Sequence, residues 1–293
     1  MVRRITAAAA VGVVVLALSL GGCGLLDNDS PVVKRDPVAS PYSGPMQVDA
    51  STRDRASVME RSGAAGQALE CDYPPSDGGA GDYGDGLESV QNNPADALGN
   101  WLDQESVDLP QTGYVIERED DGRALLSYDV AGRTKIAVIA ADDIRDYEDD
   151  TGWGVESWAR CDPAELPAAE DGDSFYDVWT DADGHRVPTS QVRSFPGPEH
   201  CDWQDITFLY VGPDPDPHQY LRDTTDELAD VLRTTYADHA VLPEDTKDTG
   251  FQHNGQELWL QPGDPNAAYL VDVEDSSHVE RWPATKQAGV ACA

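Results

Sequence analysis

Four cysteines in the body of the chain carry the clearest chemistry in the sequence, because paired thiols form disulfides in exported proteins. They are Cys71, Cys161, Cys201 and Cys292. No two of them form a Cys-x-x-Cys motif, so neither a zinc site nor a redox dithiol is predicted. Four cysteines allow three connectivities. We expect the pairs Cys71–Cys161 and Cys201–Cys292, because each bond would brace one half of the chain.

Acidic residues and histidines offer weaker candidates for a metal site. Asp181, Asp183 and Gly184 resemble half of an EF-hand calcium loop. Trp179 and Ser190 occupy the first and last ligand positions of that loop, and neither supplies the carboxylate that calcium needs there. No calcium site is therefore predicted in this loop.

Three other acidic segments are interpreted as structural. Asp214–His218 places two carboxylates near an imidazole, but its two prolines indicate a rigid extended loop. Asp142–Asp150 has six acids in nine positions, which is typical of a solvated turn. Glu156 lies between tryptophans on an expected strand, where it would either line a cleft or pair with Arg160. We favour the ion pair.

Motifs of cofactor-dependent and hydrolytic enzymes are incomplete. Gly79–Gly84 matches the letters of a dinucleotide fingerprint, but no strand is expected before it, so we predict a loop. Gly172–Tyr176 lacks the second glycine of a nucleophile elbow. No two of the six histidines have ligand spacing. We therefore predict no catalytic residue, no metal and no cofactor, and a protein that is not an enzyme.

The N-terminus has the layout of an export signal. Arg3 and Arg4 precede an uncharged apolar run from Ile5 to Leu20, which ends in small residues. The quartet Leu20-Gly21-Gly22-Cys23 resembles the bacterial lipobox. That resemblance implies cleavage before Cys23, thioether linkage of its thiol to diacylglycerol, and anchoring by acyl chains such as palmitate. The alternatives are an ordinary signal peptide with a chance cysteine and an uncleaved anchor.

The charge excludes two classes of partner. The chain has 55 acidic and 20 basic residues, a formal net charge of −35. Nucleic-acid binding needs clustered Lys and Arg, so no nucleic-acid partner is predicted. Electrostatic adhesion to anionic lipid is excluded for the same reason. The expected contact with the membrane is the N-terminal lipid alone.

The chain divides into four expected parts. Residues 1–22 are the signal peptide, and 23–55, with several prolines and no apolar period, are a disordered lipid-anchored tether. Residues 56–167 and 168–293 are two small domains, separated by the acidic break Pro163–Gly172. The expected fold class is α+β, each domain a helix with an antiparallel β-meander braced by a disulfide.

The cysteine spacing raises the question of an internal repeat. Cys71 and Cys201 are 130 residues apart, and Cys161 and Cys292 are 131 apart. Cys71-Asp72-Tyr73 and Cys201-Asp202-Trp203 also match in type. Either a degenerate tandem duplication or coincidence would produce this pattern.

The spacing of apolar residues and the positions of turn residues predict where the helices and strands lie. Helices are expected over Ser51–Glu70, after the cap Asn93 with Trp101 on its apolar face, and over Asp223–Tyr236. Ser76–Gly86 is expected to be a loop, and the Trp101 helix to cover the one buried face of the first sheet. Strands are expected at Tyr114–Arg118, Ala124–Val130, Thr134–Ala140, Trp153–Arg160, Phe175–Thr180, Ile206–Val211, Glu257–Leu260, Ala268–Val273 and Val279–Trp282.

Four segments of the C-terminal half look like a module found in lipoproteins of high-GC Gram-positive bacteria. They are His200–Trp203, Glu257–Leu260, Ala268–Val271 and Glu280–Pro283. The resemblance implies no activity. Tryptophans 158, 203 and 259 would form either core or one exposed aromatic patch.

These observations favour a non-catalytic binding protein on the outer face of the plasma membrane. Its expected partner is an envelope protein or ligand. The alternatives are a secreted hydrolase without a recognisable motif and a calcium-stabilised envelope module.

Overall fold

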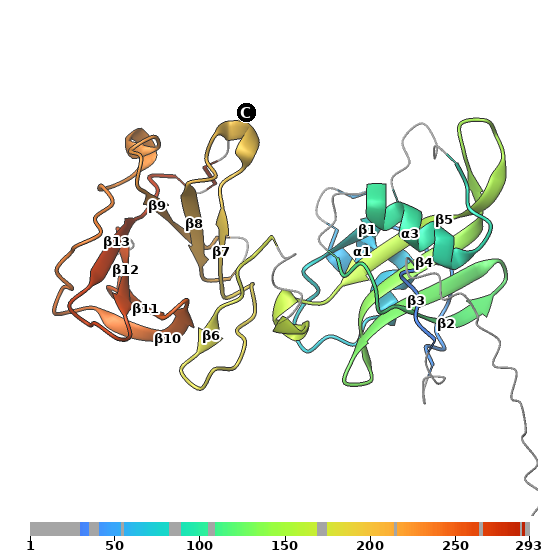
Figure 1. Ribbon diagram of the computed structural model, residues 1–293, viewed down its shortest axis with the longest axis horizontal. Helices are drawn as coiled ribbons and strands as arrows, with labels where there is room; N and C mark the ends of the chain where they lie inside the picture. Colours follow the sequence, from blue (N-terminus) through green and yellow to red (C-terminus); the bar gives the residue numbers. More distant parts are fainter. Residues whose placement is uncertain are drawn as a thin grey trace, which may run out of the picture.

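The computed structural model describes residues 30–34, 41–53, 56–81, 89–104, 109–168, 175–213, 216–263, 266–287 and 289–290. The expected signal peptide, Cys23 and Cys292 lie outside these residues. Two bodies follow one another along the chain (Figure 1). We call residues 30–168 the N-terminal body and residues 175–290 the C-terminal body. Within the described ranges, no helix has the length and apolar character needed to span a membrane.

One five-stranded antiparallel sheet forms the centre of the N-terminal body, in the order β1-β5-β4-β3-β2. The predicted four-strand meander from β2 to β5 is confirmed. Its first two turns hold Asp121–Gly122 and Ala131–Gly132, all with the positive φ that two-residue hairpins require. The strands are β1 (Asp77–Ala80), β2 (Val115–Asp120), β3 (Arg123–Val130), β4 (Arg133–Arg145) and β5 (Thr151–Arg160).

Helix α3 (Pro94–Gln104) covers one face of this sheet, as predicted. Its cap is Asn93, whose side-chain oxygen accepts the Asp96 N–H at 2.9 Å. Trp101 and its apolar neighbours pack against every second residue of β3 and β4, such as Leu126. The alternation therefore places the side chains that the sequence predicted beneath this helix.

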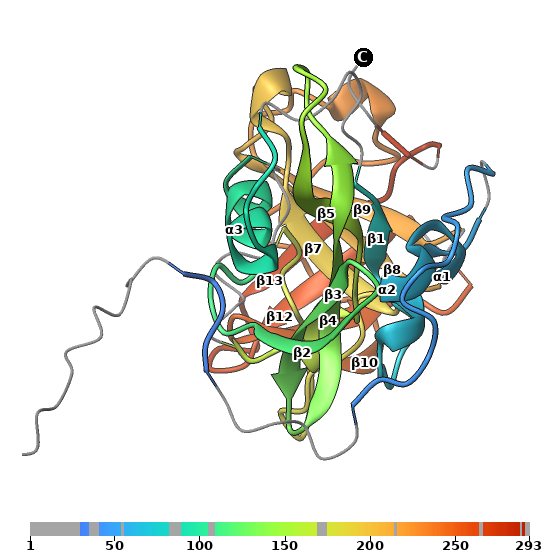
Figure 2. The same cartoon turned by 90° about the vertical axis from the view of Figure 1, so that its right-hand side faces the viewer.

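The other face of the sheet is also buried, which corrects the expectation of a single buried face. Helix α2 (Gly63–Ala68) lies on it, and Figure 2 shows α2 and α3 on opposite sides of the sheet. Leu125 and Ile139 face α2 and have no exposed surface. Strands β3 and β4 therefore carry nearly continuous apolar runs, which are typical of strands covered on both sides.

Two further expectations in this body are corrected by close backbone contacts. The helix expected over Ser51–Glu70 is two helices, α1 (Val58–Arg61) and α2, because Gly63 has φ +51° and its Cα packs against the Val48 carbonyl. The expected loop at Ser76–Gly86 contains β1, whose Gly78 lies so close to β5 that a Cβ would be 2.7 Å from the Trp158 carbonyl oxygen. Because glycine has no Cβ, the neighbouring backbone segments can approach this closely at both positions.

Two segments of the expected tether lie against the N-terminal body. Val32 forms a parallel bridge with Tyr114, and the Pro31 carbonyl accepts the N–H groups of Gly113 and Tyr114 at 3.0 and 3.1 Å. Met46 is 7% exposed and packs with α2. For residues 30–34 and 41–53 the expectation of a solvated linker is therefore corrected.

Two antiparallel sheets form the C-terminal body, in the orders β7-β8-β9 and β13-β12-β11-β10-β6. Isolated bridges join their edges, Asp177 to Ser194 and Tyr220 to Ala284. The strands are β6 (Thr180–Asp181), β7 (Val192–Pro196), β8 (Ile206–Val211), β9 (His218–Asp223), β10 (Lys247–His253), β11 (Gln256–Leu260), β12 (Ala267–Asp272) and β13 (Val279–Pro283). The two sheets enclose a barrel (Figure 1), and side chains from both of them fill its interior around Trp179, Leu209 and Trp282.

The prediction of a helix over Asp223–Tyr236 is wrong. Only the 3-10 turn η4 (Ala229–Val231) is helical in this segment. Leu228 and Leu232 are buried, as their spacing indicated, but bridges from Leu232 and Ala237 to the β13 region take the backbone hydrogen bonds that a helix would need. The described residues of this body are thus almost entirely β, and the α+β expectation holds only for the N-terminal body.

The two bodies share a strand order. In each, the last strand of a four-strand meander, β5 or β13, lies beside a strand that precedes the meander, β1 or β9. A helical segment, α3 or η4, lies between that strand and the meander. The starts of β2 and β10 are 132 residues apart, close to the cysteine offset. This order supports the tandem duplication, which stays a prediction.

Burial on the second face of the N-terminal sheet can be tested by truncation. Ile139→Ala should lower the free energy of unfolding by about 2–5 kcal/mol, because it removes a fully buried side chain beneath α2. Ile116→Ala on β2, where the side chain is 37% exposed, is the matched control and should cost less than about 1 kcal/mol. Equal losses in urea denaturation would contradict the two-sided burial.

Candidate functional site

The predicted disulfide between Cys71 and Cys161 is present, with Cα atoms 5.4 Å apart. It joins the segment before β1 to the end of β5. Cys201, in the turn η3 (Glu199–Cys201), is also disulfide-bonded, and its predicted partner Cys292 lies outside the described residues. Cys71, Cys161 and Glu165 lie close enough to hold a metal, but metals bind thiolates, and these sulfurs are bonded to each other.

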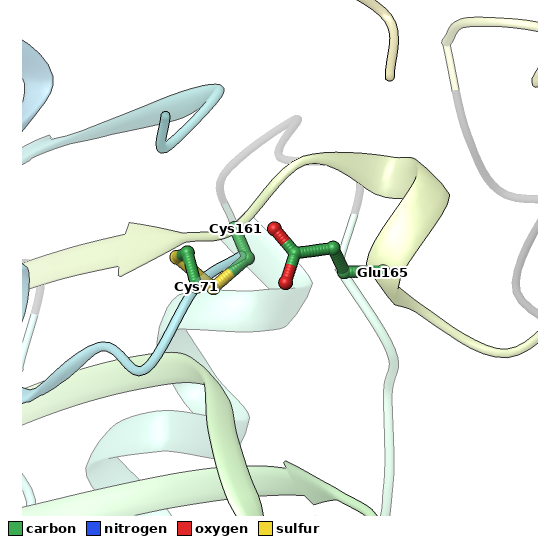
Figure 3. Close-up of side chains that lie close together, drawn as sticks. All are labelled: Cys71, Cys161 and Glu165. Atoms are coloured by element: carbon green, nitrogen blue, oxygen red, sulfur yellow. A yellow bond between two sulfur atoms is a disulfide. The ribbon is translucent and has the colours of Figure 1, made fainter. Parts of the chain in front are cut away.

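A buried ion pair lies beside this disulfide. The Lys135 ammonium is 2.6 Å from the Glu165 carboxylate, and the two side chains are 5% and 4% exposed. Glu165 points back toward the disulfide (Figure 3) and also accepts the N–H groups of Asp72 and Tyr73 at 2.7 and 3.0 Å. Lys135 donates to the Glu70 carbonyl at 2.8 Å. Each charge has several partners, so the cluster fastens the chain around Cys71.

The turn η1 (Pro163–Glu165) joins the two bodies. Asp162 caps it by accepting the Ala164 N–H at 2.9 Å. The same carboxylate, 2% exposed, accepts the N–H and hydroxyl of Thr189 at 3.0 and 2.9 Å. Arg186 donates to the carbonyls of Pro163 and Ala164. Asp162 is absent from the sequence-based candidates, although Asp followed by Pro is the signature of a capped turn.

Most of the acidic candidates from the sequence have structural roles. Glu156 pairs with Arg123 at 2.9 and 2.7 Å, which corrects the expected pairing with Arg160. Asp181 accepts the N–H groups of Asp183 and His185 and so shapes a turn after β6. The acids of residues 142–150 lie at the end of the β4–β5 hairpin.

The tryptophans do not form one patch. Trp158 is 9% exposed and packs on Trp101 in the N-terminal body. Trp203 packs on the outer side of the β7-β8-β9 sheet, and Trp259 packs on β12 in a separate cluster. The alternative of a single exposed aromatic surface at these three positions is therefore wrong.

An open cleft of about 540 Å³ lies at one end of the barrel. It reaches from His218 and Tyr220 on β9 to Lys247–Thr249 on β10 and Leu260–Gly263 after β11. We call it the apolar cleft, because its walls are mostly carbon and Tyr220 and Leu260 also belong to the barrel core. From the acidic segment 214–218 of the sequence, His218 lines this cleft.

A second cleft, of about 530 Å³, lies near the other end of β9 and has mostly polar walls. We call it the polar cleft. Burial, and then the charge of Glu280, raise the pKa of its Tyr236 to about 12, and Arg222 opposes this effect. Tyr236 therefore stays a neutral phenol in ordinary conditions. The lining residues are Arg222, Thr224, Tyr236, Ala237, Asp238, His278 and Glu280, and none was a candidate from the sequence.

The buried ion pair predicts a non-additive mutant cycle. Lys135→Met should destabilise the protein by about 3–5 kcal/mol, because it leaves the Glu165 charge buried without its cation. Lys135→Met combined with Glu165→Leu should cost less than the sum of the single changes. Denaturation with the disulfide intact measures both. Strict additivity would show that the two side chains are not coupled.

Because the pKa of Tyr236 is raised, Tyr236→Phe should leave the alkaline titration of the folded protein unchanged below about pH 11. An ordinary tyrosine ionises near pH 10, so the unfolded chain loses this proton first and folding stability should fall as pH rises through about 10 to 12. Below about pH 11, tyrosinate absorbance of wild type and Tyr236→Phe should coincide. A loss of signal in the variant with a midpoint near pH 10 would contradict the burial of this phenol.

The chain was compared with family models, with curated proteins and with solved structures, and none of the three comparisons gave a match. The joint at η1 and the two clefts are therefore interpreted from their own geometry.

Proposed function

We propose that the chain is a lipoprotein of a bacterial envelope, anchored through Cys23 on the outer face of the plasma membrane, and that it binds a protein or ligand without turning it over. The apolar cleft is the proposed binding site. The observation that carries this proposal is a cleft of about 540 Å³, open at the end of a barrel whose interior is otherwise filled.

The composition of the apolar cleft favours binding. Barrel mouths are common ligand sites, and those sites combine apolar walls with a few polar groups. Tyr220, Leu260 and Pro262 offer the apolar walls, and Lys247 offers a charge at the rim. An apolar portion of the partner would displace water from these walls, at roughly 25 cal/mol for each Å² that is buried.

The contacts around the apolar cleft argue against nucleophilic catalysis there. Thr249 is an aliphatic hydroxyl in its lining, and that hydroxyl donates to the Leu258 carbonyl at 2.8 Å. A nucleophile would need a base as its hydrogen-bond partner instead. The described contact of the His218 ring is with the Tyr220 ring, 6.5 Å between centroids.

The packed tether residues define how near the membrane the bodies are held. Seven residues separate Cys23 from Pro31, whose carbonyl accepts the N–H groups of Gly113 and Tyr114. The eight Cα–Cα steps from Cys23 to Pro31 span at most about 30 Å. An anchor at Cys23 would thus hold the N-terminal body close to the bilayer, with the barrel attached through η1.

In-cell cross-linking and pull-down test the proposal. The wild type should capture a defined partner, and Cys23→Ala should lose it if the anchor supplies proximity. Leu260→Asp and Lys247→Glu should each reduce capture at least about tenfold, because they change the wall and the rim of the apolar cleft.

Val241→Asp is the matched control, since Val241 is 89% exposed and does not line this cleft. It should retain the partner at the wild-type level. Each variant is first shown by circular dichroism to be folded. If Leu260→Asp, Lys247→Glu and Val241→Asp then capture equal amounts of the partner, the apolar cleft is not the binding site.

A further inference from the structure

The polar cleft is separate from the proposed binding site and contains side chains held in fixed positions. Residues of β9, of the segment 236–238 and of β13 meet there. Arg222 and Glu280 lie on neighbouring elements and form an ion pair, with Arg222 Nε 3.3 Å from Glu280 Oε2. The Glu280 side chain is 10% exposed, so this carboxylate is almost wholly withdrawn from water.

Glu280 is held from two directions. Its Oε2 also accepts the indole N–H of Trp282 at 2.8 Å, and Trp282 belongs to the barrel core. The core therefore fixes the carboxylate, and the carboxylate orients the guanidinium. Arg222 is 39% exposed, and its Cζ lies 5.7 Å from the centroid of the Tyr236 ring. The Arg222 guanidinium, the Glu280 carboxylate and the Tyr236 ring thus meet at one edge of the cleft.

The charges in the polar cleft select the class of ligand. One cation, Arg222, and two carboxylates, Glu280 and Asp238, line it together with His278 and the neutral hydroxyls of Thr224 and Tyr236. Arg222 and Glu280 neutralise each other, and Asp238 leaves the lining with one net negative charge, so an anion gains nothing by entering. The net charge of −35 further disfavours polyanions.

A neutral, hydroxyl-rich ligand suits this arrangement. Adjacent hydroxyls can each donate to a carboxylate and accept from a guanidinium, and charge-assisted hydrogen bonds are the stronger kind. The Tyr236 side chain lines the cleft and combines an aromatic ring with a polar tip, which suits the C–H and O–H groups of a sugar. We propose that the polar cleft binds a neutral saccharide, as a site independent of the apolar cleft.

Calorimetric titration of the full-length Cys23→Ala protein tests this site. The neutral probes are maltotriose and tri-N-acetylchitotriose, and the charged probe is a glucuronate-containing tetrasaccharide. At least one neutral probe should bind with a Kd between about 10 μM and 1 mM. The charged probe should bind at least about tenfold more weakly, and saturation with the neutral probe should change the tryptophan emission, because the Trp282 indole donates to Glu280.

Substitutions assign the binding to this cleft. Tyr236→Phe and Asp238→Asn keep the Arg222–Glu280 ion pair and should each weaken binding of the neutral probe at least about threefold, and Glu280→Gln at least about tenfold. Leu260→Asp, in the apolar cleft, should leave the affinity unchanged, so that failure here is distinct from failure of the proposed function. The proposal is overturned if no neutral probe binds at about 5 mM, if the glucuronate-containing probe binds equally well, or if Tyr236→Phe and Asp238→Asn leave the affinity unchanged.

Discussion

The arrangement of the whole molecule depends on six consecutive residues, Cys161 to Leu166. Cys161 is bonded to Cys71, and Glu165 is paired with the buried Lys135, so both fasten the segment to the N-terminal body. Asp162 and the carbonyls of η1 bind Thr189 and Arg186, which belong to the C-terminal body. Leu166 completes the first core. A disulfide, an ion pair and a capped turn thus act on one short segment, and a change at any of them reaches both bodies.

Polar groups of the segment Cys161–Leu166 form the joint between the two bodies. Because these groups are buried, the joint specifies one arrangement of the bodies. The Asp162 carboxylate is 2% exposed and has four hydrogen bonds from Thr189 and Ala164. A buried carboxylate that lost these donors would cost several kcal/mol, whereas an apolar contact would tolerate sliding. In the proposed lipoprotein, the joint would transmit position from the anchored N-terminal body to the barrel. Both clefts would then be held at a set place relative to the membrane, as a binding protein with a short anchor needs.

The sequence predicted what local chemistry determines and missed what distant contacts determine. Alternation and Asp-Gly or Ala-Gly turns predicted the meander, and Asn93 before Pro94 predicted the start of α3. Gly78 resembled a loop because the partner that requires a glycine, β5, is 80 residues away. Leu228 and Leu232 have helical spacing, but pairing with the β13 region decided the backbone. The Cys71–Cys161 disulfide is a distant contact that was nevertheless predicted, because each expected pair would brace one half of the chain. Arg222, Tyr236 and Glu280 carry no motif, because the closure of the barrel alone brings them together.

The joint at Cys161–Leu166 fixes the two bodies relative to each other, and a distance measurement between spin labels tests this directly. Labels on Ile116→Cys in the N-terminal body and Val241→Cys in the C-terminal body, both exposed, report their separation. We expect one narrow distance distribution in the otherwise wild-type chain and a broad one after Asp162→Ala. A broad distribution before that substitution, or a narrow one of unchanged mean after it, would contradict the role of Asp162 and its neighbours in holding the two bodies together.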